Sequence, residues 1–165
     1  MVVLGIDPGT ATLGWGIIKR TEGEAYKVGA YGCIRTDRSN LFSRRLEEIH
    51  KKLSRVIKKY QPDIAAIEQL FFAKNVKTAI SVGEARGVAI LAAAEANLPV
   101  AEYTPLQVKQ SLVGYGRAEK KQIQKMLKVL LGLKDIPKPD DAADALAVAL
   151  CHLNSQRMDK VGKRR

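Results

Sequence analysis

Two short apolar runs of this chain each end in an acidic residue, and this pattern constrains the fold more than any other. Asp7 follows the apolar residues 2–6, and Glu68 follows residues 64–67. A short apolar run bounded by turn signals is typical of a buried strand. A carboxylate at the end of such a strand is costly to bury unless a partner compensates its charge. The sequence therefore predicts two interior strands whose acids lie side by side.

A second pair of acids lies near the chain end, in residues 140–144. Residues three apart are neighbours on a helix, so Asp141 and Asp144 are expected to share one helix face. Spacing alone leaves Asp140 open, because it lies four residues from Asp144, although its place after Pro139 suits a helix N-cap. Oxygen ligands drawn from separated segments suit Mg²⁺ or Mn²⁺. The four acids together predict a metal site.

The charge of the chain favours a polyanionic partner. It has 28 Lys and Arg against 17 Asp and Glu, a formal net charge of +11, which is typical of nucleic-acid binding. Each acid alone also has a structural explanation: Asp7 in a turn, Glu68 in a salt bridge, and the helix pair on the surface. Their joint occurrence in so basic a chain favours metal-dependent chemistry on a nucleic acid.

The order of the predicted elements indicates an α/β fold with one five-stranded mixed sheet and helices on both faces. Three early strands with short connections predict an antiparallel meander. The expected strands are 2–7, 13–18, 26–34, one ending at 68, and 99–103; the expected helices are 41–60, 76–97, and about 105–112, 119–132 and 140–154. We expect one domain over residues 1–154, followed by a basic, disordered tail over residues 155–165.

Other residues exclude several classes of protein. We expect no signal peptide and no membrane span, because every apolar run is too short. The two cysteines, Cys33 and Cys151, do not make a disulfide framework, so we expect them reduced in a cytoplasmic protein. We expect His50 and His152 at the surface or at helix ends rather than as catalytic bases.

Four motifs, in this order along the chain, resemble the RuvC family of crossover junction endodeoxyribonucleases. They are residues 5–10 (GIDPGT), 67–69 (IEQ), 83–87 (GEARG) and 141–147 (DAADALA). The resemblance covers residues 1 to about 153 and implies an RNase H-like nuclease domain. It also implies that the catalytic and metal-binding carboxylates are Asp7, Glu68, Asp141 and Asp144. Some relatives have His where this chain has Asp141.

The activity implied by the resemblance is the resolution of Holliday junctions by paired symmetric nicks, in homologous recombination and DNA repair. Two Mg²⁺ ions per subunit are expected, with Mn²⁺ as a substitute, because two divalent ions serve both ends of an in-line phosphodiester displacement. Asp7 is the expected bridging ligand. The implied partners are four-way junction DNA, a second copy of the chain, and the RuvA–RuvB branch-migration complex.

Nine residues are candidates for contact with DNA. A Phe beside a nuclease site can stack on an unpaired base, and the resemblance assigns this role to Phe71, although a Phe in this segment can also anchor it on the core. Lys109 and Lys120 match family positions that carry basic residues near the active site; the remaining lysines also suit a solvated helix face. The full set is Phe71, Phe72, Lys74, Asn75, Lys109, Arg117, Lys120, Lys121 and Lys125.

The helix expected over residues 76–97 is too apolar for a helix with one solvated side. It is either a central core helix or the contact between two copies of the chain. A four-way junction has approximate two-fold symmetry, which an isologous dimer matches. The expected dimer contacts are Val82, Gly83, Gly87 and Ile90.

Two other classes remain open at this point. The turn at residues 5–10 also resembles the phosphate-binding turn of actin, heat-shock chaperone ATPases and sugar kinases, although those proteins need a second such domain. Another RNase H-like nuclease, such as one that processes ribosomal RNA precursors, is the second alternative. ATP turnover without DNA would indicate the first class.

Overall fold

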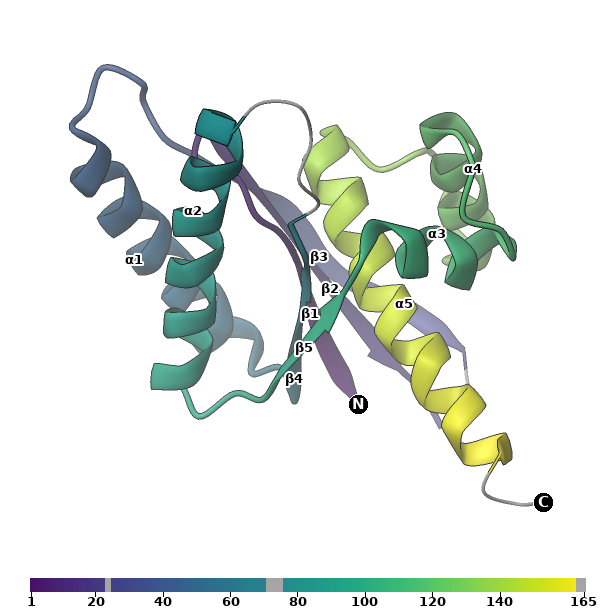
Figure 1. Ribbon diagram of the computed structural model, residues 1–165. Helices are drawn as coiled ribbons and strands as arrows, with labels where there is room; N and C mark the ends of the chain where they lie inside the picture. The colour runs from purple at the N-terminus through teal and green to yellow at the C-terminus, as the bar shows by residue number, and fades with distance from the viewer. Residues whose placement is uncertain (23–24, 71–75, 163–165) are drawn as a thin grey trace.

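The computed structural model describes residues 1–22, 25–70 and 76–162 of the 165-residue chain. One mixed sheet of order β3-β2-β1-β4-β5 lies between two layers of helices (Figure 1). The strands are β1 (Val2–Asp7), β2 (Thr12–Arg20), β3 (Tyr26–Arg35), β4 (Ile64–Glu68) and β5 (Val100–Tyr103), and the helices are α1 (Phe42–Tyr60), α2 (Val76–Glu95), α3 (Pro105–Val113), α4 (Lys120–Leu130) and α5 (Asp140–Gly162). The α/β class, the five-stranded mixed sheet and the helices on both faces are confirmed.

The pairing of the central strands brings the two predicted strand-end acids together. β1 pairs antiparallel with β2 and parallel with β4, and Ile6 lies opposite Ile67. Asp7 and Glu68 are the next residues along these two parallel strands, so they leave the sheet at the same edge. The predicted antiparallel meander of the first three strands is also confirmed.

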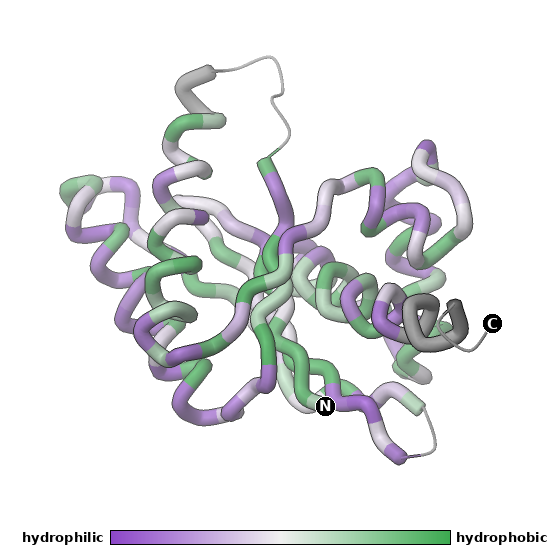
Figure 2. Tube along the Cα trace, turned by 60° about the horizontal axis from the view of Figure 1, so that its bottom comes forward, coloured by the Kyte–Doolittle hydropathy of each residue, from purple (hydrophilic) through white to green (hydrophobic). Residues whose placement is uncertain are grey.

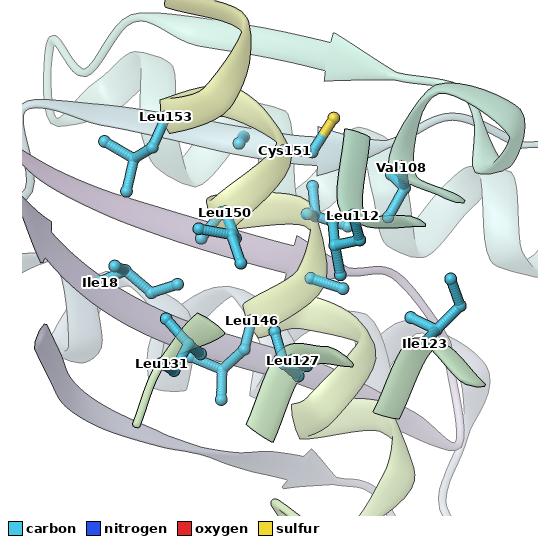
Figure 3. Close-up of a cluster of buried hydrophobic side chains, with 14 of the residues drawn as sticks. Ile18, Val108, Leu112, Ile123, Leu127, Leu131, Leu146, Leu150, Cys151 and Leu153 are labelled. Carbon is cyan, nitrogen blue, oxygen red and sulfur yellow. The ribbon is translucent and has the colours of Figure 1, made fainter. Parts of the chain in front are cut away.

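Two apolar layers hold the helices on the sheet, one on each face. α1 and α2 cover one face with residues such as Ile49, Leu53 and Ala89, all fully buried. On the other face α5 lies between the sheet and the pair α3 and α4, so its side chains are buried nearly all round (Figure 3). Figure 2 shows the same division, with apolar strands at the centre and helices of mixed character outside. Burial on this scale is the main stabilising contribution to the fold.

Glycines in β1 and β2 let α5 lie directly on the sheet backbone. A Cβ atom added at Gly5 would overlap the carbonyl oxygen of Ala145, and one added at Gly14 would overlap the carbonyl oxygen of Asp141. The absence of a side chain at these two positions therefore sets how close the first turns of α5 come to the end of β1. The close approach brings the acids of α5 within reach of Asp7.

Gly14→Ala should lower the free energy of unfolding by about 1–3 kcal/mol, because the new methyl group forces α5 away from β2. Urea denaturation monitored by circular dichroism measures this change. Gly29→Ala is the matched control in β3, since the nearest atom to its added Cβ would be the flexible Ile17 Cγ2, 3.2 Å away, and the Ile17 carbonyl oxygen would lie at 3.8 Å. Equal losses of stability in the two variants would contradict the account of the close approach.

The last helix differs from its expected length and from the expected environment of one histidine. α5 continues to Gly162, so the prediction of a helix end near 154 and a disordered segment after it is wrong for residues 155–162; residues 163–165 lie outside the described residues. No proline or glycine interrupts residues 155–161, and the Ser155 hydroxyl donates to the Cys151 carbonyl at 3.0 Å. His152 is 4% exposed, not at the surface, and its Nδ1 pairs with the Tyr103 hydroxyl at 2.7 Å. The packing of α5 between layers buries it, which helix periodicity alone does not reveal.

Two of the sequence-based expectations concern disulfides and membrane spans. Cys33 and Cys151 are both free thiols. Among the helices of the described ranges, none is long and apolar enough to cross a membrane.

Candidate active site

The four predicted carboxylates converge at one edge of the sheet. Asp7 ends β1 and Glu68 ends the neighbouring β4. Asp141 and Asp144 lie in the first turns of α5, whose N-terminal end reaches the same edge of the sheet (Figure 1). The negative charges of the other three acids all act on the Asp7 carboxyl. Three separate segments thus bring four acids into one electrostatic cluster.

The pKa of Asp7 is raised from 3.8 to about 8. Burial of the carboxyl is the largest cause, and the charges of Glu68, Asp144 and Asp141 add to it. The positive charge of Lys120 lowers the pKa of Asp7, but by less than burial and the other acids raise it. The Asp7 carboxyl therefore holds a proton near neutral pH when no cation compensates the cluster.

The pKa values of Glu68 and Asp144, which are partly buried, have similar causes. Burial and the charge of Asp144 raise the pKa of Glu68 to about 7, whereas a hydrogen bond with Asp7 and the charge of Lys109 lower it. Burial also raises the pKa of Asp144, against a hydrogen bond from Lys120. Asp7 and Glu68 therefore share a proton where two ionised carboxylates would repel each other.

Two of the predicted DNA-binding lysines border the cluster. The Lys120 Nζ lies 3.0 Å from Asp144 Oδ2 and 3.2 Å from Asp140 Oδ2. Lys109 and Lys120 line a hollow of about 260 Å³ together with Glu68 and Asp144. The hollow lies on the side of the cluster covered by α3 and α4, and a polyanion that enters it meets cations and acids together.

Asp140 differs from its two neighbours in the acid run. It is the first residue of α5 rather than the expected N-cap, and its side chain is 62% exposed. A hydrogen bond from Lys120 lowers its pKa, and Gln124 Nε2 donates to its Oδ1 at 3.1 Å. Asp140 therefore belongs to the rim of the site, whereas the charge of Asp141 acts on the partly buried Asp7.

The donor set fits a hard divalent cation in its chemistry. It supplies only carboxylate oxygens, which Mg²⁺ and Mn²⁺ prefer, and the raised pKa values of Asp7 and Glu68 reveal negative charge that lacks compensation. In the arrangement of the described residues, no three acidic, His or Cys side chains lie close enough to enclose an ion. Asp7 and Glu68 are joined by a hydrogen bond, and Asp144 is paired with Lys120. A bound cation would compensate the negative charge that these contacts leave.

The remaining candidate residues lie in three places. Arg117, Lys121 and Lys125 are exposed at and before α4 and do not line the hollow beside the acids. Phe71, Phe72, Lys74 and Asn75 lie outside the described residues. On α2, Gly87 is exposed, and the other three expected dimer contacts, Val82, Gly83 and Ile90, are partly exposed.

A polar network next to Glu68 was not predicted from the sequence. Gln69, the next residue, donates from Nε2 to Glu102 Oε2 at 3.2 Å, and Arg86 of α2 forms an ion pair with the same Glu102. Gln69 and Arg86 belong to two of the motifs quoted above, but Glu102 on β5 joins them only through the fold. The network ties the end of β4 to α2 and so helps to fix the position of Glu68.

Asp7→Asn should stabilise the protein by several kcal/mol at pH 8 in buffer without divalent ions, because each unit of the pKa difference corresponds to about 1.36 kcal/mol. The folded-state pKa of Asp7 lies above its unfolded value, so this group costs stability as the pH rises from about 4 to about 8. An amide carries no charge and can still donate to Glu68. Thermal melts from pH 5 to pH 8 measure the gain, with the exposed Asp135→Asn as control. A variant no more stable than the parent at pH 8 would contradict the burial of an uncompensated acid.

Known proteins share both the sequence and the fold. A family model described as "Crossover junction endodeoxyribonuclease RuvC" matches residues 3–152. A protein of that name from Caldicellulosiruptor saccharolyticus is 61% identical over 155 residues, which cover 94% of this chain and 93% of the relative. One from Desulforamulus reducens is 57% identical over 152 residues, 92% of this chain and 93% of the relative. The solved structure "T. thermophilus RuvC in complex with Holliday junction substrate" is 35% identical and superposes with a TM-score of 0.87, covering 96% of each chain.

Proposed function

Because the chain belongs to the RuvC family of crossover junction endodeoxyribonucleases, we propose that its converging carboxylates bind two Mg²⁺ ions and cut opposed strands of a Holliday junction. The protein is a metal-dependent endodeoxyribonuclease that resolves such junctions in recombination and repair. The two alternative classes, an actin-like phosphate-binding protein and a nuclease of ribosomal RNA precursors, do not fit this family. The convergence of four acids at one edge of the sheet is the observation that carries the proposal.

Each acid has a proposed role in holding the ions. Asp7 lies at the centre of the cluster, since the charges of Glu68, Asp141 and Asp144 all act on it, so it is proposed to bridge both ions. Glu68 then serves one ion and the two acids of α5 serve the other. Divalent ions held by these residues would supply a nucleophilic water of lowered pKa and would stabilise charge on the leaving oxygen. Mn²⁺ is expected to substitute for Mg²⁺, because it prefers the same oxygen donors.

The basic residues of the hollow are proposed to hold the scissile strand. Lys109 and Lys120 lie beside Glu68 and Asp144, where a phosphate that approaches the acids would arrive. Lys120 contacts the acids directly and is thus placed to stabilise charge that builds up on the phosphate. Arg117, Lys121 and Lys125 are proposed to bind phosphates farther along the arms, which positions DNA without reading its sequence.

Phe71 is proposed to stack on an unpaired base at the crossover point. The residue itself lies outside the described residues, but the chain leaves β4 at Glu68, only three positions earlier. A wedge attached so close to a catalytic acid would couple the opening of the junction to the placement of the scissile phosphate. Phe72, Lys74 and Asn75 are proposed to support the same contact.

Exposed apolar residues on α2 support a proposed homodimer, whose two active sites would each act on one of two opposed DNA strands. Ile80 is 59% exposed and Leu91 is 52% exposed, and Gly87, which is also exposed, falls on the same helix face. An apolar stripe of this kind on an otherwise basic protein favours a contact with a second copy. Of the predicted contacts, Gly83 and Ile90 flank this stripe, whereas Val82 lies on another face of the helix and lines the hollow that contains Arg45 and Asp141.

Two further expectations rest on the family alone. They are a functional partnership with the RuvA–RuvB branch-migration complex and a cytoplasmic location. Co-purification of tagged protein with these partners on junction DNA, and fractionation of cells, would test them.

The proposed function is tested with a synthetic four-way junction and a linear duplex of the same sequence. We expect nicks only with Mg²⁺ or Mn²⁺, only in the junction, and at symmetric positions on two opposed strands. Denaturing gels with each of the four strands labelled in turn map these positions. Equal cleavage of the linear duplex, or cleavage in the presence of a chelator, would overturn the proposal.

A further inference from the structure

A second hollow lies beside the carboxylates, on the face of the sheet covered by α1 and α2. It measures about 400 Å³ and meets the acid cluster at Asp141. The Lys109–Lys120 hollow lies on the opposite face, where α3 and α4 lie, and includes Glu68 and Asp144. The second hollow is lined by residues 9–12, Arg38, Arg45, Ser81, Val82 and Asp141.

Two arginines give this hollow a positive wall. Arg45 is held in place by Thr36: its Nε donates to the Thr36 hydroxyl at 2.9 Å, and that hydroxyl donates to the Thr10 carbonyl at 2.6 Å. The bond uses one of the five N–H donors of the guanidinium group. Arg38 is exposed and forms no ion pair with another residue of the described ranges. A nearby acid, Asp37, accepts from the Ser39 backbone at 2.9 Å.

The position of Arg45 in α1 independently favours an anion. Arg44 and Arg45 lie in the first turn of this helix, which contains no acidic residue and has no side-chain cap. Cations in the first turn oppose the helix dipole, and exposed N–H groups there attract negative charge. The Arg45 guanidinium also lies over the Phe42 ring, 6.0 Å from its centroid, so two contacts fix its position while N–H donors remain for an anion.

We propose that Arg38 and Arg45 bind a backbone phosphate of the cleaved DNA strand, next to the scissile phosphate and on its Asp141 side. Guanidinium groups match phosphate oxygens in planar, bidentate geometry. The strand would then cross the acid cluster between two positive walls, from Lys109 and Lys120 to the two arginines. This inference rests on the proposed function, because it assumes that the four acids cut DNA.

The first test measures binding of Arg38→Gln and Arg45→Gln to a four-way junction in a chelating buffer. Each variant should bind about fivefold to tenfold more weakly, and the slope of log K against log salt should decrease by about one. Arg44→Gln is the matched control: it removes the same charge one residue away, from a side chain that is 71% exposed and paired with Glu47. Equal losses in all three variants would overturn the inference, since general charge would then explain them.

The second test locates the phosphate. Junctions carry a single neutral methylphosphonate at successive positions on either side of the mapped nick. At one position the methylphosphonate should weaken junction binding by the parent protein about fivefold to tenfold. The same methylphosphonate should not weaken binding by Arg38→Gln, because this variant has already lost the contact with that phosphate. If the methylphosphonate weakens binding by the parent protein and by Arg38→Gln equally at every position, the inference is overturned.

Two controls separate the possible failures. Arg45→Gln also loses the hydrogen bond to Thr36 and can therefore lower the melting temperature. If it does so, and every methylphosphonate still weakens its binding as in the parent protein, the role of Arg45 is overturned. The exposed Arg38 is then tested by Arg38→Gln alone. Gel filtration shows whether either variant alters the oligomeric state, and a shift to monomer would assign the hollow to the contact of two copies instead. If the parent protein does not cut the junction, the proposed function fails; if it cuts and the arginine variants bind normally, only this inference fails.

Discussion

Asp7→Asn should slow junction cleavage at least about a thousandfold while junction affinity stays within about threefold of the parent protein. Asp7 is at the centre of the acid cluster, so its loss removes a ligand proposed to be shared by both ions. Metal ions supply several kcal/mol of charge stabilisation in the transition state, and each 1.36 kcal/mol corresponds to a factor of ten in rate. The affinity for the junction comes from basic residues outside the acid cluster, so the substitution should leave it nearly unchanged.

Single-turnover cleavage at saturating protein measures the rate for Asp7→Asn, and a gel-shift assay with Ca²⁺ or chelator measures the affinity. Asp135→Asn is the control, since it removes an exposed acid that the site does not use. The same Asp7→Asn protein should be more stable than its parent without metal. Opposite changes in stability and activity are typical of a strained catalytic site. Metal-dependent cleavage at the parental rate would remove Asp7 from the site.

Phe71→Ala should slow cleavage about tenfold to a hundredfold and weaken junction binding much less. Stacking on a base is worth about 1–3 kcal/mol, and the proposed wedge uses this energy to hold the crossover open beside Glu68. The deciding measurement compares an intact junction with one that already has unpaired bases at the crossover. A wedge predicts that the opened substrate restores most of the lost rate.

The alternative for Phe71 is a structural role in the core. In that case Phe71→Ala would lower the melting temperature and reduce binding and cleavage together, with no rescue by the opened junction. Phe72→Ala is the matched control, because it removes the same ring one position along the chain. If only Phe72→Ala shows rescue, the wedge belongs to Phe72.

The sequence was sufficient to predict the elements that pattern alone determines. Apolar runs that end in an acid predicted β1 and β4 and, through their parallel pairing, the meeting of Asp7 and Glu68. Helical spacing predicted that Asp141 and Asp144 share a face. These features depend on residues close in sequence or on a simple rule for adjacent strands, so periodicity captures them.

Features that depend on the packing of distant segments were not predictable in this way. The burial of His152 follows from the position of α5 between two layers, and the ion pair of Arg86 with Glu102 joins α2 to β5. In the sequence Arg45 is one of several basic residues of a helix, and only the fold brings it to the hollow that Asp141 also lines. The environment of each of these side chains is created by tertiary structure, which a local pattern does not encode.

The location of bound metal tests the central claim most directly. Crystals of the protein soaked in Mn²⁺ give anomalous scattering peaks wherever the ion binds. We predict two peaks per subunit at the edge of the sheet where β1 and β4 end, one contacting Glu68, one contacting the acids of α5, and both contacting Asp7. The same soak of Asp7→Asn should lose at least one peak. Mn²⁺ bound elsewhere, or no peak near Asp7 in a protein that still cuts junctions with Mn²⁺, would contradict the account.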